Sequence, residues 1–168
     1  MNQILETERL KLREFTIHDT GFIIELLNSP GWLQFIGDKG IKTEEQAKAY
    51  LENGPLKSYR HNGFGLFLVE TKENSQAIGM CGIIRRDNLE NPDIGFALLP
   101  AYNGKGYAYE IASATLAYAH NQLALRKISA ITLPNNIRSI QLLEKLGLSY
   151  LETIILPGSE EELLLYSN

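Results

Sequence analysis

The stretch from Leu98 to Ala108 constrains this chain most, because it joins a strand pattern to a helix pattern through two glycines. Apolar strand spacing runs over residues 93–99, and helical spacing continues to about His120. The first N–H groups of a helix lack intrahelical acceptors and carry the positive end of the helix dipole, so they favour an anion. Gly104 and Gly106 would let the backbone approach that anion and adopt a positive φ. The stretch predicts a phosphate cradle, the alternative being a plain strand-to-helix connection.

Two familiar phosphate loops are excluded by the residues around Lys105. A P-loop needs Gly-x-x-x-x-Gly-Lys followed by Ser or Thr, and no such run is present. A dinucleotide-binding turn needs a third glycine and an acidic residue at the end of the following strand, and both are missing. The predicted phosphate site is therefore of another kind.

Composition narrows the classes of partner. The 168 residues suffice for one domain, residues 1–168, with an adequate core. The net charge of −4 gives a nucleic acid no overall attraction, so we expect none as a partner. The single cysteine, Cys81, excludes an intrachain disulfide, and with three scattered histidines it makes no metal-ligand spacing. With no leader or membrane-spanning run recognisable, we expect a cytoplasmic protein with no membrane partner.

Hydrophobic periodicity predicts a mixed α/β fold. Strand patterns occupy residues 9–15, 64–70, 77–85, 93–99, 127–133, 148–156 and 162–166. Helical patterns follow residue 16, run from 44 until a break near 53–55 with a short helical piece continuing to Arg60, and cover 107–120 and 137–146. The order β-α-α-β-β-β-α-β-α-β-β gives a six- to seven-stranded mixed sheet with helices on both faces. A helix separates strands 93–99 and 127–133, so this pair should be parallel.

Four motifs follow one another along the chain. They are Thr-Glu-Arg-Leu-Lys-Leu-Arg at 7–13, Asp-Ile-Gly-Phe at 93–96, Tyr-Asn-Gly-Lys-Gly-Tyr-Ala-Tyr-Glu at 102–110, and Asn-Ile-Arg-Ser at 136–139 with Leu-Glu-Lys-Leu-Gly-Leu at 143–148. Together they make almost the whole chain resemble the GNAT superfamily of acyl-CoA-dependent N-acyltransferases. The nearest branch resembles the Rim-type ribosomal-protein alanine N-acetyltransferases. Gly106 and Ala108 match the family pattern Gln/Arg-x-x-Gly-x-Gly/Ala, whereas Asn103 departs from its first position.

The resemblance implies a single GNAT-like domain that takes acetyl-CoA as acetyl donor and needs no metal. Backbone N–H groups from Gly104 to Ala108 would hold the CoA pyrophosphate. The backbone around Leu98 would bond the pantetheine arm as an added strand would, within a splay between strands 93–99 and 127–133. The implied cofactor-binding residues are Leu98, Asn103, Gly104, Lys105, Gly106, Tyr107, Ala108 and Asn136.

The resemblance also supplies candidates for proton transfer. The superfamily often has a tyrosine one turn beyond Asn-x-x-Ser, but Leu143 stands there. In Rim-type relatives the serine of that motif is the candidate acid, which maps to Ser139; alternatively Asn136 simply caps the helix. Asp93 matches an acidic position of the relatives and is the candidate base, the alternative being an ion pair with a nearby arginine. Cys81 is expected to be a buried strand residue rather than an acyl carrier.

The expected function is transfer of an acetyl group from acetyl-CoA directly to a primary amine in a ternary complex. The acceptor would be a protein N-terminus or a small amine, and the protein a bacterial monomer or homodimer. The alternative is a CoA-binding regulatory domain that has lost transfer, which the missing tyrosine and Asn103 favour. The apolar residues of the expected loop 32–42 either fill the core or line the acceptor pocket.

Overall fold

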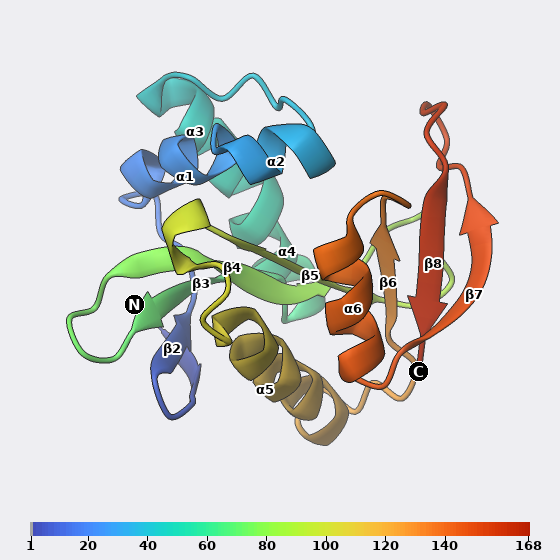
Figure 1. Ribbon diagram of the computed structural model, residues 1–168. Coiled ribbons are helices and arrows are strands. Elements are labelled where there is room, and N and C mark those ends of the chain that lie inside the picture. Colours follow the sequence, from blue (N-terminus) through green and yellow to red (C-terminus); the bar gives the residue numbers. More distant parts are fainter. Residues whose placement is uncertain (1) are drawn as a thin grey trace.

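The computed structural model describes residues 2–168 and is built on one eight-stranded sheet (Figure 1). The strands are β1 (Gln3–Glu6), β2 (Leu10–Arg13), β3 (Leu66–Thr71), β4 (Ala77–Ile84), β5 (Asp93–Leu98), β6 (Ser129–Thr132), β7 (Ser149–Ile154) and β8 (Leu163–Ser167). Their spatial order is β1-β2-β3-β4-β5-β6-β8-β7. The sheet therefore contains one strand more than the six or seven predicted, namely β1.

All neighbouring strands are antiparallel except β5 and β6. The parallel crossover predicted for this pair is confirmed, and the long helix between them makes the connection. β8 lies between β6 and β7 and is antiparallel to both. The mixed α/β sheet predicted from the hydrophobic pattern is thus present, with its parallel step next to the glycine stretch.

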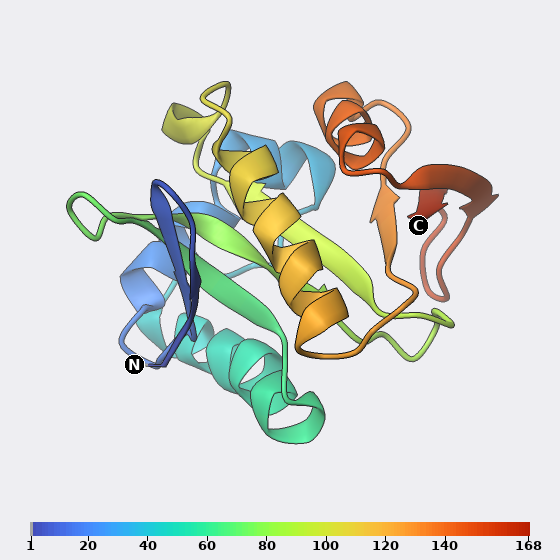
Figure 2. The ribbon, with the colours of Figure 1, turned by 90° about the horizontal axis from the view of Figure 1, so that it is seen from below.

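Helices cover both faces of the sheet, as predicted (Figures 1 and 2). They are α1 (Thr20–Leu27), α2 (Pro30–Phe35), α3 (Glu44–Leu51), α4 (Lys57–Asn62), α5 (Tyr107–Asn121) and α6 (Ile137–Lys145), with a π-helical turn, η1 (Glu52–Leu56), and a 3₁₀ turn, η2 (Pro100–Tyr102). A core that includes Leu26, Trp32 and Leu51 joins α1, α2 and α3 to one face. A second core that includes Ile111 and Leu143 joins α5 and α6 to the other face.

Small side chains let α5 lie close to the sheet. Its buried residues are Ile111, Ala112, Thr115, Leu116 and Ala119, which follow the helical spacing seen in the sequence. The Thr115 hydroxyl donates to the Ile111 carbonyl at 2.7 Å and lies 3.3 Å from the Cys81 sulfur on β4. This packing fixes where the N-terminus of α5 stands relative to the end of β5.

Three local predictions are wrong. The first part of the expected loop 32–42 is helical, because Ser29 and Pro30 begin α2 directly after α1 has ended. The break expected near residues 53–55 is instead a π-helical turn that carries Pro55 and joins α3 to α4, which occupies the place of the short helical piece expected up to Arg60. β1 was missed because it has only four residues and no alternation of burial, and it pairs on one side only.

Candidate active site

The connection from β5 to α5 has the backbone that a phosphate cradle requires. β5 ends at Leu98, η2 follows, and Asn103 leads in extended conformation to Gly104 and Gly106. Gly104 has φ +74° and Gly106 has φ +81°, both in the left-handed region where a side chain is strained. A Cβ built at Gly104 would meet no atom within 4 Å, so the space in front of this turn is open.

The N-terminus of α5 presents a run of free backbone donors. Glu110 is the first residue whose N–H enters the helix, donating to the Gly106 carbonyl at 3.1 Å. Within residues 2–168, no carbonyl or side chain accepts the N–H groups from Gly104 to Tyr109. These donors stand at the positive end of a 15-residue helix, an arrangement suited to an anion.

The remaining side chains of the turn lie on its surface. Asn103 is exposed, and only its backbone is engaged, donating to the Pro100 carbonyl at 3.2 Å. The Lys105 ammonium lies 5.7 Å from the Tyr102 ring centroid. Tyr107 is half-buried beneath the guanidinium of Arg9, 4.3 Å from ring centroid to Cζ. Lys105 thus adds a positive charge next to the free donors, whereas Tyr107 faces the N-terminal hairpin.

β5 and β6 splay apart beyond their first residues, as predicted. Asp93 pairs with Ser129, and no later pair in the described chain joins the two strands. The Leu99 N–H donates to Ile78 at 2.8 Å, towards β4. Successive residues of a strand direct their backbone groups to opposite edges, so Phe96 and Leu98 direct theirs towards β6. An unpaired strand edge therefore lines the splay and leads towards the cradle.

Asp93 lies at the narrow end of this splay and is almost completely buried, with 1% of its surface exposed. Its Oδ1 accepts a hydrogen bond from Arg86 Nε at 3.0 Å. Burial raises the pKa of Asp93 from 3.8 to about 6, although the charge and hydrogen bond of Arg86 oppose the rise. The ion pair with an arginine is therefore present, whereas the role of Asp93 as a base stays a prediction, for which a pKa near neutral pH is suitable.

Ser139 lies in the first turn of α6, which packs against α5 and β6 (Figure 1). Asn136 caps this helix, since its Oδ1 accepts the Ser139 N–H at 3.3 Å. The Ser139 hydroxyl is half-buried and has no hydrogen-bond partner among residues 2–168. Asn136 is therefore occupied with the helix, whereas the serine oxygen remains available. Hydrogen bonds do not connect Ser139 to Asp93 in the described structure.

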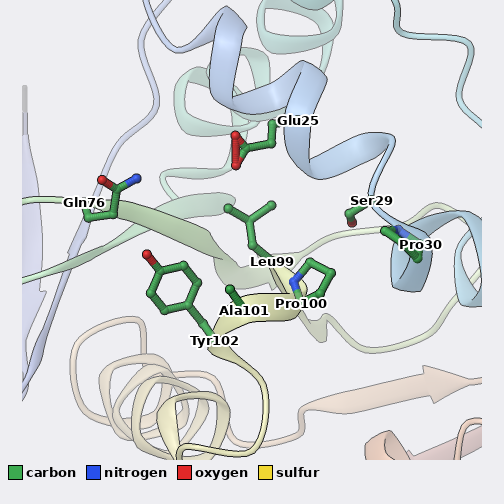
Figure 3. Close-up of a pocket in the computed structure, with 8 residues that line it drawn as sticks. All are labelled: Glu25, Ser29, Pro30, Gln76, Leu99, Pro100, Ala101 and Tyr102. Carbon is green, nitrogen blue, oxygen red and sulfur yellow. The ribbon is translucent and has the colours of Figure 1, made fainter.

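A hollow of about 450 Å³ lies beside the end of β5, on the side of α1 (Figure 3). The Tyr102 hydroxyl and the Gln76 amide lie to one side of Leu99, and the carboxylate of Glu25 lies above it. Its lining, all within the described residues, includes none of the predicted site residues. Trp32, for which core and pocket were both considered, is a core residue with 6% exposure, whereas Ile36 is exposed.

The structure offers no metal site, since no cluster of three histidine, cysteine or acidic residues occurs in residues 2–168. No helix of the described chain has the length and apolar character needed to span a membrane.

Sequence reasoning missed one group of residues near the cradle: Thr7 and Arg9 both contact Glu110. The motif that contains Thr7 and Arg9 indicated the family, but nothing in it indicated that these residues contact Glu110.

Comparison with known proteins identifies the class of protein. Residues 9–149 match the family model of the acetyltransferase (GNAT) domain. The chain therefore belongs to this family: it is an acyltransferase, and its acyl donor is acetyl-CoA. The resemblance inferred from the four motifs is thereby confirmed at the level of the family.

One relative in sequence and two solved structures illustrate what the chain is similar to. The Bacillus subtilis (strain 168) protein named "Uncharacterized protein YkkB" is 31% identical over 153 residues, covering 89% of this chain and 87% of the relative. A ribosomal L7/L12 alpha-N-protein acetyltransferase, RimL, in complex with coenzyme A has TM-score 0.82 and 15% identity, covering 99% and 97%. A spermidine N-acetyltransferase from Vibrio cholerae in complex with CoA and spermine has TM-score 0.77 and 20% identity, covering 95% and 94%. At these identities the two structures demonstrate the shared fold.

Proposed function

We propose that this protein transfers the acetyl group of acetyl-CoA directly to a primary amine, in a single catalytic domain that holds both substrates at once. The observation that carries the proposal is the continuity between the unpaired edge of β5 and the six free N–H groups from Gly104 to Tyr109. A ligand with an extended amide-containing arm and a pyrophosphate at its end matches that surface. Acetyl-CoA has this construction.

In the proposed complex, the pyrophosphate accepts hydrogen bonds from the N–H groups between Gly104 and Ala108, with Lys105 adding positive charge. The pantetheine amides pair with the backbone of Phe96 and Leu98, which faces the splay. This pairing directs the thioester towards the narrow end of the splay, where Asp93 lies. Positioning of two substrates contributes much of the rate, on the order of 7–11 kcal/mol in favourable cases.

The chemical step needs a neutral amine, a polarised carbonyl and a proton for the leaving thiolate. The amine nitrogen attacks the thioester carbon, and a backbone N–H of β5 stabilises the oxyanion. The carbon–sulfur bond then breaks, the Ser139 hydroxyl supplies the proton for the thiolate and regains one from solvent, and Asp93 accepts the amine proton through water and returns it to solvent. The raised pKa of Asp93 suits this exchange, and the Ser139 hydroxyl has no competing partner among the described residues.

Direct transfer is favoured over an acyl-cysteine intermediate. Cys81 is the single cysteine of the chain and is completely buried on β4. Burial raises the pKa of its thiol to about 12, and the thiol contacts Thr115 at 3.3 Å. A thiol that is inaccessible and protonated is a poor nucleophile.

The acceptor is proposed only as a primary amine, either a protein N-terminus or a small molecule. The structural neighbours include both kinds, a ribosomal-protein acetyltransferase and a spermidine acetyltransferase. The chain is further proposed to act in the bacterial cytoplasm as a monomer or homodimer. A panel of peptides and polyamines distinguishes the acceptors.

Thermal unfolding with acetyl-CoA, CoA and ATP tests the donor site. At about 100 times its dissociation constant a ligand stabilises the fold by roughly 2.7 kcal/mol, so acetyl-CoA and CoA should raise the midpoint while ATP should not. Release of free CoA thiol in the presence of an amine then tests transfer. Double-reciprocal plots of initial rate, with both substrates varied, should give intersecting lines if a ternary complex forms. Stabilisation without thiol release from any amine would favour the CoA-binding regulatory domain. No stabilisation by either CoA compound would contradict the proposed site.

A further inference from the structure

The carboxylate of Glu110, in the first turn of α5, receives hydrogen bonds from the turn between β1 and β2. Its Oε2 accepts from the Thr7 hydroxyl at 2.5 Å and from the Arg9 backbone N–H at 2.9 Å. Its Oε1 accepts from Arg9 Nε at 2.7 Å. One carboxylate thus holds both the backbone and the side chain of Arg9.

The Arg9 guanidinium reaches from this carboxylate to the turn before α5. Its Nη1 donates to the Lys105 carbonyl at 3.0 Å, and its Cζ lies 4.3 Å from the ring centroid of Tyr107. Its Nη2 would be 3.4 Å from a Cβ built at Gly106. The guanidinium therefore contacts Lys105 and Tyr107 of the proposed cradle and lies beside Gly106 between them.

The contact at Lys105 determines the direction of the next N–H group. In a trans peptide the carbonyl of one residue and the N–H of the next point in opposite directions. Because the Lys105 carbonyl points at Arg9, the Gly106 N–H points away from it, towards the other side of the turn. Arg9 therefore lies behind the turn, on the opposite side of this peptide from the Gly106 N–H donor.

Charge is balanced at the same place. A carboxylate in the first turn of a helix interacts favourably with the helix dipole but repels a phosphate at that terminus. Partial burial raises the pKa of Glu110, but hydrogen bonds from Thr7 and Arg9 outweigh burial and hold the pKa below its usual value. Glu110 is therefore charged at neutral pH, and Arg9 compensates that charge beside the turn.

We propose that Arg9, held by Glu110, is a positioning residue that sets the peptide plane between Lys105 and Gly106 for the pyrophosphate of acetyl-CoA. This inference rests on the proposed function of the cradle and extends it to residues behind the turn. It separates two roles that arginine can have near a phosphate. A direct ligand acts through its charge, whereas a positioning residue acts through the peptide that it orients.

Glu110→Gln distinguishes these roles, because it removes a negative charge near the phosphate. Gln retains an acceptor for Thr7 and the Arg9 N–H but loses the bond to Arg9 Nε. If Arg9 were a direct ligand, this variant would bind acetyl-CoA equally well or more tightly. Positioning predicts weaker binding instead, by about tenfold, the size expected for loss of a charged hydrogen bond.

The experiment measures the Kd for acetyl-CoA by calorimetry, together with kcat and both KM values, in wild type, Glu110→Gln and Arg9→Lys. Lysine keeps the charge but cannot contact Glu110 and Lys105 together, so it should weaken binding similarly. In both variants we expect kcat and the KM for the amine to change by less than about twofold. Glu6→Gln is the matched control, because it breaks the hairpin's 3.3 Å ion pair with Lys72 without touching the cradle.

Unchanged or tighter acetyl-CoA binding by folded Glu110→Gln would overturn the positioning role while leaving the proposed function intact. Equal weakening in Glu6→Gln would also overturn it, because the effect would then belong to the hairpin as a whole. Failure of wild type to bind acetyl-CoA would instead contradict the proposed function itself. The two ideas therefore fail in distinguishable ways.

Discussion

Replacing Asp93 by Asn should remove a pH-dependent contribution to stability. Burial raises the pKa of Asp93 from 3.8 to about 6, so folding favours its protonated form. Such a group stabilises the fold fully below pH 3.8, and that stabilisation is lost as the pH rises through about 6. The separation of the two pKa values corresponds to about 3 kcal/mol, at about 1.4 kcal/mol for each pH unit. Asparagine cannot titrate and therefore lacks this slope.

Urea unfolding of wild type and Asp93→Asn between pH 4 and pH 7 measures the effect. The free energy of unfolding of wild type, relative to the variant, should fall by about 2.4 kcal/mol over this range, because part of the full effect lies below pH 4. Other carboxyl groups are common to both proteins, so their contributions cancel in the difference. Asp87→Asn is the control, because that carboxyl is exposed in the loop that leads into β5, and it should follow wild type. A difference between wild type and Asp93→Asn that does not change with pH would refute the reasoning.

The remaining predictions concern catalysis. If Asp93 is the base, kcat should rise with pH through about 6 in wild type, and this limb should be absent from the pH profile of Asp93→Asn. Gly106→Val should raise the Kd for acetyl-CoA by more than about tenfold, because φ is +81°, which valine adopts only with strain, and the new side chain would press on the Arg9 guanidinium behind the turn; unchanged affinity in a folded variant would contradict the site. Ser139→Ala should lower kcat by about 10²-fold with acetyl-CoA affinity retained, and equal turnover would remove Ser139 from the mechanism. Cys81→Ala should lower the free energy of unfolding by about 1–2 kcal/mol yet still transfer acetyl groups, whereas complete loss of transfer in a folded variant would point to an acyl-cysteine.

Local features of the site were predictable from the sequence because their causes are local. Glycines directly before a long amphipathic helix indicate a turn with left-handed backbone, and Gly104 and Gly106 both have positive φ. The Asn136 cap and the buried face of α5 depend on spacings of three or four residues, which a sequence displays directly. The parallel step from β5 to β6 follows from the intervening helix.

Features that depend on distant contacts were not predictable. Arg9 and Glu110 are 101 positions apart, and neither motif signals that it meets the other. The position of β8 between β6 and β7 also leaves no local trace, because the residues of a strand do not specify which strands it will pair with. α2 was missed for another reason: a Ser-Pro pair that can end one helix here begins the next.

The insertion of β8 between β6 and β7 has a consequence for how the chain acquires its structure. The strands β1 to β5 pair with one another, and α5 packs on them, using residues 3–121 alone. This part of the chain can therefore assemble while the remainder is still being synthesised. β7 pairs with β8 alone, and β6 has only a single pair with β5 before β8 arrives. The outer strands must therefore wait for residues 163–167 to leave the ribosome. Deleting residues 163–167 should therefore disorder more of the chain than it removes, namely β6 and β7, which pair with β8, and α6, which packs on β6.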